Sequence, residues 1–101
     1  MLDPAEIHDK LETIEKDLEV RQNPLGEAAQ KWFAAKRDQE KAFAEAFIAA
    51  EGSVEARKAA ATVETSDIGR VEEAEFEARK RAIAVLETRA TILQTLAKVG
   101  R

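Results

Sequence analysis

Apolar residues recur at intervals of three and four along most of the chain, which is the period of one face of an α-helix. The broadest such face lies in the last quarter, between Phe76 and Val99. Its members are Ala82, Val85, Leu86, Arg89, Ala90, Leu93, Leu96 and Ala97, with Ile83 and Ile92 on its flanks. A face this wide predicts a helix that packs against neighbours on more than one side.

The N-terminal quarter carries a narrower apolar seam. Its members follow one another at steps of four, three and four, a spacing typical of a coiled coil: Ile7, Leu11, Ile14 and Leu18. Asp3 is placed to cap the helix, with Pro4 at the first helical position and Glu6 three residues after the cap. The pattern predicts a first helix over residues 4–22.

The dipeptide Asn23-Pro24 predicts an interruption or kink, because proline lacks an N–H and disfavours helical dihedrals at the preceding residue. The apolar stripe then continues in a second helix over residues 24–51. Its members are Leu25, Ala29, Trp32, Phe43, Phe47 and Ala50. Gly52 follows as the expected left-handed C-cap.

Ser53 is a good N-cap for a third helix, which we expect over residues 53–99 and closed by Gly100. The first half of this helix offers small residues that predict close packing: Ala56, Ala60, Val63, Val71, Ala74 and Ala78. Residues 62–69, with the sequence TVETSDIG, have low helix propensity. A bend or break is expected there.

Gly52 lies at the midpoint of the 101 residues, so a fold-back there pairs the two halves over their full length. Leu18 then lies beside Leu86 and Ile14 beside Ala90, so that apolar residues meet along both arms. The sequence therefore predicts an all-α fold: one domain of residues 1–101 forming a long antiparallel helical hairpin of coiled-coil type, its N-terminal arm kinked near Pro24.

Composition and charge agree with this interpretation. The chain is 36% charged and 45% hydrophobic with only two prolines and four glycines, a balance typical of long helices. Residues 1–20 contain seven acids and two lysines, whereas residues 78–101 contain six basic residues and one acid. The hairpin also brings together Lys31, Lys36 and Arg37 with Glu72, Glu73, Glu75 and Glu77. Such pairs set the register more than they add stability.

A hairpin of two helices buries one seam and leaves its other apolar faces exposed to water. Because compact domains of this size bury more than half of their unfolded surface, we expect a homo-oligomer, a helical bundle, or a protein partner. The candidate association surface consists of Phe33, Phe76, Ile83, Ile92 and Leu96.

Catalytic and metal-binding chemistry is not expected. The absence of cysteine excludes disulfides and thiolate ligands, and His8 with Glu12 is the only histidine-carboxylate pair at helical spacing. The carboxylates between residues 72 and 77 lack the facing Glu-x-x-His motif of di-iron bundles. No phosphate-binding glycine loop and no nucleophile motif is present. The sequence predicts neither an enzyme nor a cofactor.

A nucleic-acid interface is the alternative to a protein interface, since five basic residues gather on the last helix. They are Arg79, Lys80, Arg81, Arg89 and Lys98. The net charge of −4 and the acidic N-terminal arm favour pairing with carboxylates over pairing with phosphate. No apolar run approaches the length of a membrane span and no leader is recognisable, so we expect a soluble cytoplasmic protein.

Four segments of the sequence resemble a family of small helical proteins encoded by phages of actinobacteria. These are LExxxxxLEVR at residues 11–21, where x is any residue, LGEAAQKWF at residues 25–33, AEGSV at residues 50–54 and VLETRA at residues 85–90. The resemblance implies a phage accessory protein in the host cytoplasm, and it assigns no site residues. Three roles stay open: an interaction module that docks a phage or host protein, an accessory nucleic-acid-binding protein in recombination or replication, and a ligand-sequestering counter-defence oligomer.

Overall fold

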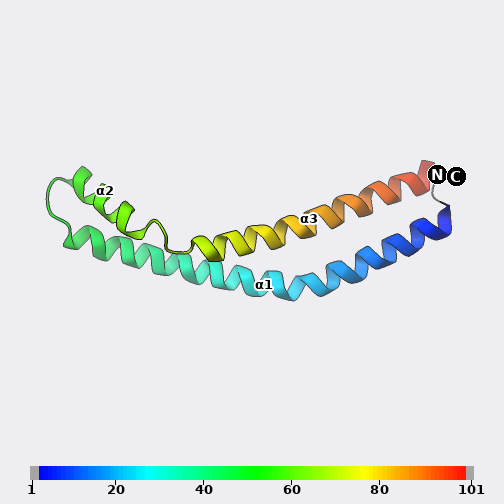
Figure 1. The fold of residues 1–101 in the computed structure, drawn as a ribbon, viewed down its shortest axis with the longest axis horizontal. Coiled ribbons are helices and arrows are strands. Elements are labelled where there is room, and N and C mark those ends of the chain that lie inside the picture. Colours follow the sequence, from blue (N-terminus) through cyan, green and yellow to red (C-terminus); the bar gives the residue numbers. More distant parts are fainter. Residues whose placement is uncertain (1–2, 100–101) are drawn as a thin grey trace. The chain divides into compact units, whose positions relative to one another are not determined.

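Three helices make up the part of the chain that the computed structural model describes, residues 3–99. They are α1 (Pro4–Ala49), α2 (Val54–Thr65) and α3 (Arg70–Val99), and residues 3–99 form no strand (Figure 1). The expected all-α class is therefore confirmed. The expected cap at Gly100 and the terminal base Arg101 lie outside the described residues.

The start of α1 follows the predicted cap. The backbone N–H of Glu6 donates to Asp3 Oδ1 at 2.9 Å, and the N–H of Ile7 donates to the Asp3 carbonyl at 3.1 Å. These bonds satisfy donors that have no partner within the first turn.

Helix α1 continues through Pro24 for 46 residues, so the separate helices expected over residues 4–22 and 24–51 were wrong. Proline removes one N–H, and with it the bond to the carbonyl of Val20, at a cost of about 3 kcal/mol. Pro24 and Leu25 are both half-buried on the packed face, and this packing offsets the missing bond. The helix ends two residues earlier than expected, at Ala49, and the kink at Pro24 stays a prediction.

The expected third helix over residues 53–99 is divided at residues 66–69, where the sequence indicated low helix propensity. Gly69 adopts a φ of +84°, which ends the run of helical dihedrals. The N–H of Ile68 donates to the Thr65 carbonyl at 3.2 Å, and the N–H of Arg70 donates to the Asp67 carbonyl at 3.4 Å. The predicted bend or break is confirmed as a tight turn.

The connection between α1 and α2 follows the expected capping. Gly52 has a φ of +106°, the left-handed conformation predicted for it. Ser53 caps α2, with its Oγ accepting from the N–H of Ala56 at 3.2 Å.

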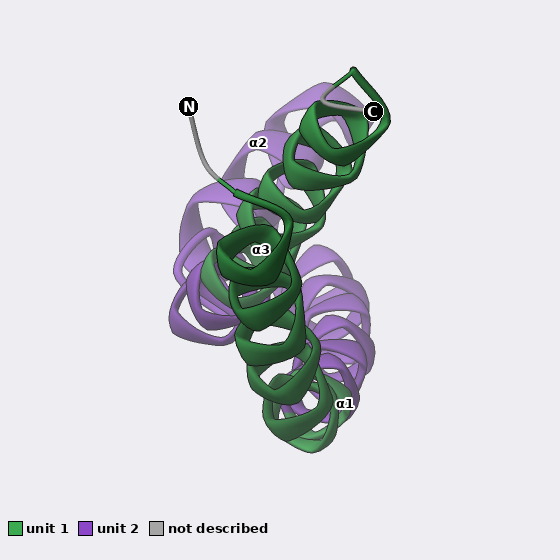
Figure 2. Cartoon of the chain, turned by 90° about the vertical axis from the view of Figure 1, so that its right-hand side faces the viewer, with its two compact units in different colours: residues 1–27, 77–101 green, residues 28–76 purple. Residues whose placement is uncertain are grey.

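The chain divides into two compact units (Figure 2). Unit 1 comprises residues 1–27 and 77–101, and unit 2 comprises residues 28–76. Both α1 and α3 contribute residues to both units. The single-domain organisation stays a prediction.

In unit 1 the N-terminal part of α1 lies antiparallel beside the C-terminal part of α3 (Figure 1). Ile7 and Leu86 are buried, and the other members of the expected N-terminal seam, Leu11, Ile14 and Leu18, are half-buried. The half-buried apolar residues of α3 in this unit are Ala82, Ile83, Ala90, Leu93 and Ala97. Burial in unit 1 thus follows the seam that the spacing indicated.

In unit 2 the packed face of α2 differs from the one expected. The small residues Ala56, Ala60, Val63, Val71 and Ala74 are exposed, as is Ala78 in unit 1. The packed positions follow a neighbouring stripe, formed by Arg57, Ala61, Thr65, Ile68, Gly69, Glu72 and Phe76. Ala61 is completely buried.

Polar residues can occupy this stripe because their polar atoms find partners. Thr65 Oγ1 donates to the Ala61 carbonyl at 2.8 Å, and Gln39 Nε2 lies 3.4 Å from the Thr65 carbonyl. Arg57 Nε donates to the Phe47 carbonyl at 3.1 Å, and the guanidinium carbon lies 4.4 Å from the centroid of the Phe47 ring. Gln39 and Thr65 are equally distant from Gly52 in sequence, and so are Phe47 and Arg57.

Candidate association surfaces

The candidate association residues of unit 2 form one aromatic pair. The ring centroids of Phe33 and Phe76 are 6.3 Å apart, with an interplanar angle of 54°. This tilted geometry is favourable for two aromatic rings. Phe33 is half exposed and Phe76 is half-buried, so the pair presents an apolar edge to solvent.

The candidate residues of unit 1 do not all share one surface. Ile92 is 54% exposed and Leu96 is 47% exposed, whereas Ile83 is half-buried. Because each helical residue turns about 100°, Ile83 and Ile92 point to roughly opposite sides of α3. Ile92 and Leu96 belong together, and Ile83 belongs to the other flank of the packed face.

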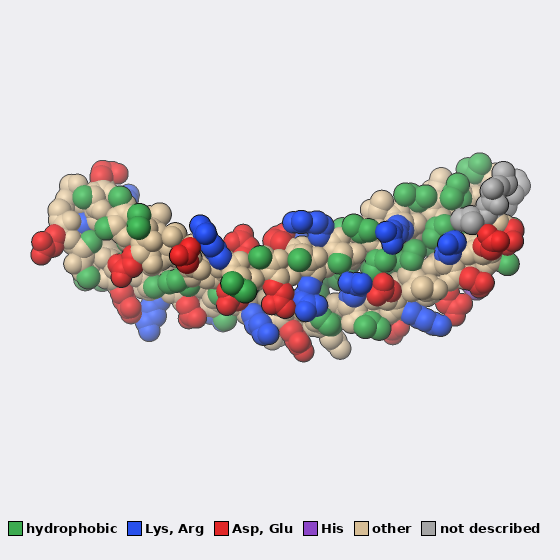
Figure 3. Space-filling model, viewed as in Figure 1, with side chains coloured by type: hydrophobic (Ala, Val, Ile, Leu, Met, Phe, Trp, Pro, Cys, Tyr) green, Lys and Arg blue, Asp and Glu red, His purple; other side chains and the backbone are tan. Residues whose placement is uncertain are grey.

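A second apolar stripe runs along the C-terminal half of α3, and we call it the outer stripe. Its members are Val85, Arg89, Ile92, Leu96 and Val99, all of them exposed. They follow one another at steps of four, three, four and three, the heptad spacing of a coiled-coil seam. Figure 3 shows hydrophobic side chains exposed along this part of α3.

The outer stripe lies about 100° around α3 from the residues that pack on α1. The sequence analysis placed Val85, Arg89 and Leu96 together with the packed residues on one broad apolar face, and in the structure these three residues lie on its exposed side. The steps of four and three from Val85 to Val99 reveal the outer stripe in the sequence, and the exposure of its members separates it from the packed face.

A groove lies between the outer stripe and α1 within unit 1. It has a volume of about 600 Å³. It is lined by Asp9, Lys10, Thr13 and Ile14 from α1 and by Arg89, Ile92 and Leu93 from α3. Three of these seven side chains are aliphatic and three are charged. The groove therefore suits an amphipathic helix better than a small polar ligand.

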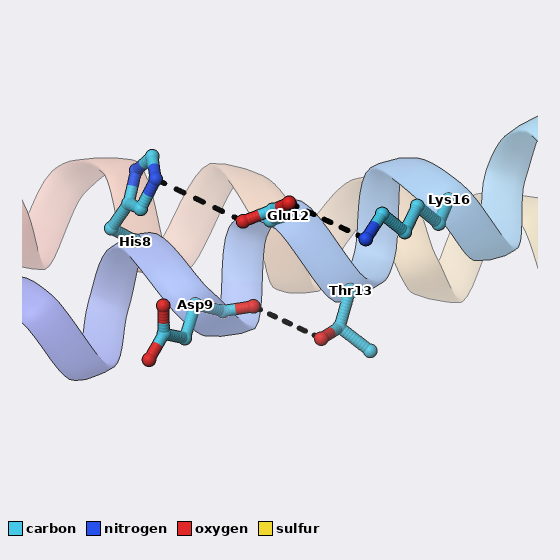
Figure 4. A network of polar contacts seen from close by, with 5 residues as sticks. All are labelled: His8, Asp9, Glu12, Thr13 and Lys16. Carbon is cyan, nitrogen blue, oxygen red and sulfur yellow. Dashed lines mark hydrogen bonds and ion pairs between the residues drawn. The ribbon is translucent and has the colours of Figure 1, made fainter.

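The exposed face of α1 carries polar contacts within the helix (Figure 4). Glu12 lies between two partners, with His8 Nε2 at 3.9 Å from Oε2 and Lys16 Nζ at 3.3 Å from Oε1. Thr13 Oγ1 donates to the Asp9 carbonyl at 3.0 Å. Within residues 3–99 no group of three or more His, Cys, Asp or Glu side chains is arranged to hold a metal ion.

No protein family, curated protein or solved structure matches this chain. Over the described range, no helix is long and apolar enough to cross a membrane.

The five candidate nucleic-acid contacts all lie on α3 but point in different directions. Arg89 belongs to the outer stripe and Arg81 lies near it, while Lys80 and Lys98 project from the opposite side of the helix. Lys80 Nζ also lies 3.6 Å from Glu77 Oε1. Arg79 projects toward a third side. These residues do not line one continuous basic face along α3.

Several ion pairs of the described chain connect residues three or four positions apart. Examples are Arg21 with Asp17 at 2.9 Å and Arg70 with Asp67 at 3.3 Å. Lys36 Nζ lies 5.5 Å from the centroid of the Trp32 ring, also four residues away. The expected pairing of Lys31, Lys36 and Arg37 with the glutamates at residues 72–77 stays a prediction.

Proposed function

We propose that this chain is a non-enzymatic helical interaction module that acts as a homo-oligomer. The chain folds back at Gly52 as an antiparallel helical hairpin of coiled-coil type, and the hairpin associates with a second copy into a helical bundle. In this form it docks a protein of a phage or of its host.

The observation that carries the proposal is the set of large apolar side chains left in contact with water in both units. They include Phe33, Ile48, Val71, Ile92 and Val99, and each of them is at least half exposed. Exposed apolar surface of this kind marks sites of protein association.

The register of the contacts supports the hairpin. In unit 2 the contacts of Gln39 with Thr65 and of Phe47 with Arg57 join residues equally distant from Gly52. In unit 1, Ile14 and Leu93 line the same groove and lie 38 and 41 residues from Gly52. The equal distances from Gly52 in unit 2 are what a fold-back at Gly52 requires.

The phage connection rests on the resemblance of the four sequence segments, and it makes this chain an accessory protein. A helical module without catalytic groups acts by binding, and exposed apolar stripes bind other helices. If the gene lies within a phage or prophage genome, the connection holds, and a chromosomal gene without phage neighbours would contradict it.

The experiment is a measurement of molar mass in solution by light scattering, which does not depend on the shape of the particle. We expect at least twice the chain mass of 11.2 kDa at micromolar concentration, with dissociation on dilution. A mass of 11.2 kDa at every accessible concentration would refute self-association.

We do not propose a nucleic-acid role, because the basic side chains of α3 project to several sides of the helix. If such a role existed, binding to DNA would weaken steeply with added salt. A mobility-shift assay at low salt is the direct measurement.

A further inference from the structure

We infer that α2 is a strap that opens from α1 as a unit while the rest of the chain stays folded, and that Arg57 is the residue that holds it closed. When α2 opens, Phe43 and Phe47 of α1 lose their cover and become accessible to solvent. This opening involves unit 2 alone and does not depend on self-association.

Helix α2 buries little apolar surface. Its buried residues are Ala61 and Thr65, whereas its larger apolar side chains, Val54 and Val63, are 55% and 77% exposed. A helix of 12 residues is only marginally stable in water without packing. Segments with few buried apolar contacts open at a lower free energy than the whole molecule. Helix α2 therefore opens before unit 2 as a whole unfolds.

The contact between α2 and α1 is also incompletely filled. A groove of about 330 Å³ lies between the end of α2 and the facing part of α1. It is lined by Gln39, Glu40 and Phe43 from α1 and by Thr62, Thr65 and Ser66 at the end of α2. Well-packed protein interiors have few spaces larger than a water molecule. The atoms that line the groove lack contact partners on one side, which weakens the attraction between the two helices.

Left-handed glycines lie in the connections at both ends of α2. Gly52 precedes it with a φ of +106°, and Gly69 follows it with a φ of +84°. Figure 1 shows α2 between these connections, beside the C-terminal part of α1. Both connections lie outside the helices, so a change in their dihedral angles moves α2 without unwinding a helix.

Arg57 joins the first turn of α2 to the last turn of α1. Its Nε donates to the Phe47 carbonyl at 3.1 Å, and its guanidinium carbon lies 4.4 Å from the centroid of the Phe47 ring. Carbonyls in the last turn of a helix have no partner within the helix, and this turn of α1 contains no basic residue of its own. Arg57 supplies both the missing donor and a positive charge, which the end of a helix favours.

Labelling of single cysteines measures the opening, because the chain contains no cysteine of its own. Ala61 of α2 is completely buried, and Ala28 of α1, in the same unit, is 3% exposed. Ala61→Cys and Ala28→Cys thus make the same change at two buried positions, of which only the first lies on α2. With a chromogenic aromatic disulfide, Ala61→Cys should react at least about tenfold faster than Ala28→Cys. It should still react more slowly than Ala60→Cys at an exposed position of α2.

The variant Arg57→Gln tests which residue holds the strap. Combined with Ala61→Cys, it should increase the labelling rate about fivefold, because the bond to the Phe47 carbonyl and the contact with the ring are lost. Lys58→Gln is the matched control, since it removes the same charge from an exposed neighbouring position. It should leave the rate unchanged within about twofold. Equal acceleration by the two variants would show that Arg57 does not hold α2 and would overturn the inference.

Hydrogen exchange on the unmodified chain keeps the test independent of the new thiol, which could itself loosen a completely buried position. The backbone amides of residues 57–65 should exchange at least about tenfold faster than those of residues 28–36 in α1, and their exchange should depend less on urea because the opening exposes little surface. Equal exchange rates with the same urea dependence would show that α2 opens only when the whole unit unfolds. That result, or equal labelling of Ala61→Cys and Ala28→Cys, would overturn the inference.

Discussion

Because Gly69 has a left-handed conformation, replacing it with alanine should lower the free energy of unfolding. In Gly69→Ala the new side chain would be placed on a backbone with a φ of +84°, which costs L residues about 1–2 kcal/mol. The Cβ would also lie 3.0 Å from Trp32 Cζ3 and 3.4 Å from Ala35 Cβ. The Trp32 ring would have to shift, at a further cost of about 1 kcal/mol. We expect a total loss of about 2–3 kcal/mol in the free energy of unfolding.

Gly26 provides the matched control. It lies inside α1, and a Cβ added there meets nothing within 4 Å. Gly26→Ala should therefore raise the free energy of unfolding by up to about 1 kcal/mol, the difference in helix propensity between the two residues. The same chemical change is thus expected to have opposite effects at the two positions.

The assay is urea unfolding followed by circular dichroism, at one fixed protein concentration because oligomerisation makes stability depend on concentration. Thermal unfolding followed by the same signal gives a second measurement. Near the melting temperature, a change of 1 kcal/mol in the free energy of unfolding corresponds to roughly 4–8 °C for a chain of this size. The melting temperature of Gly69→Ala should then be at least about 8 °C lower than that of the parent chain. If alanine stabilised the chain equally at both positions, residues 54–99 would form one continuous helix and the turn at 66–69 would be refuted.

Two further substitutions test the packing within each unit by the same assay. Leu86→Ala should lower the free energy of unfolding by about 2–3 kcal/mol, because it leaves a cavity in unit 1. The control Val63→Ala, at an exposed position, should change it by less than about 0.5 kcal/mol. Equal effects of the two substitutions would contradict the assigned core. Arg57→Lys keeps the charge but loses the Nε bond and the flat contact with Phe47, so a loss of about 1 kcal/mol is expected at low and high salt alike. The exposed Arg70→Lys is the control and should have almost no effect, and a salt-sensitive loss at Arg57 would point to an ion pair instead.

The seam of unit 1 was predictable because its apolar residues repeat at coiled-coil spacing and carry no competing polar atoms. The packed face of α2 was not predictable from the sequence, because hydropathy favours burial of Val63 over burial of Thr65. The burial of Thr65 depends on its hydroxyl bonding to the Ala61 carbonyl, and that of Arg57 depends on the Phe47 ring. Such local satisfaction of polar groups is decided by the three-dimensional contacts, and a pattern of hydrophobicity does not report it.

The two positions at which the sequence predicts an interruption of a helix, Pro24 and residues 66–69, behave in opposite ways in the structure. Proline at residue 24 is the strongest local breaker in the chain, yet α1 continues through it, and Pro24 and Leu25 are half-buried on its packed face. The weaker signals at residues 66–69 do end a helix, because Gly69 supplies a left-handed dihedral next to the bulky Trp32. The outer stripe was visible in the spacing, but only the exposure of Val85, Ile92 and Leu96 separates it from the packed face.

The 46 residues of α1 contribute to both units without interruption, and this constrains how the length of the gene product can change. Inserting or deleting one residue within this helix turns every later side chain by about 100°, so the seam would be out of phase from that point onward. The connections at residues 50–53 and 66–69 lie between helices and have no such phase to keep. Natural length variants of this protein should therefore differ at those two connections, and in α1 mainly by whole heptads.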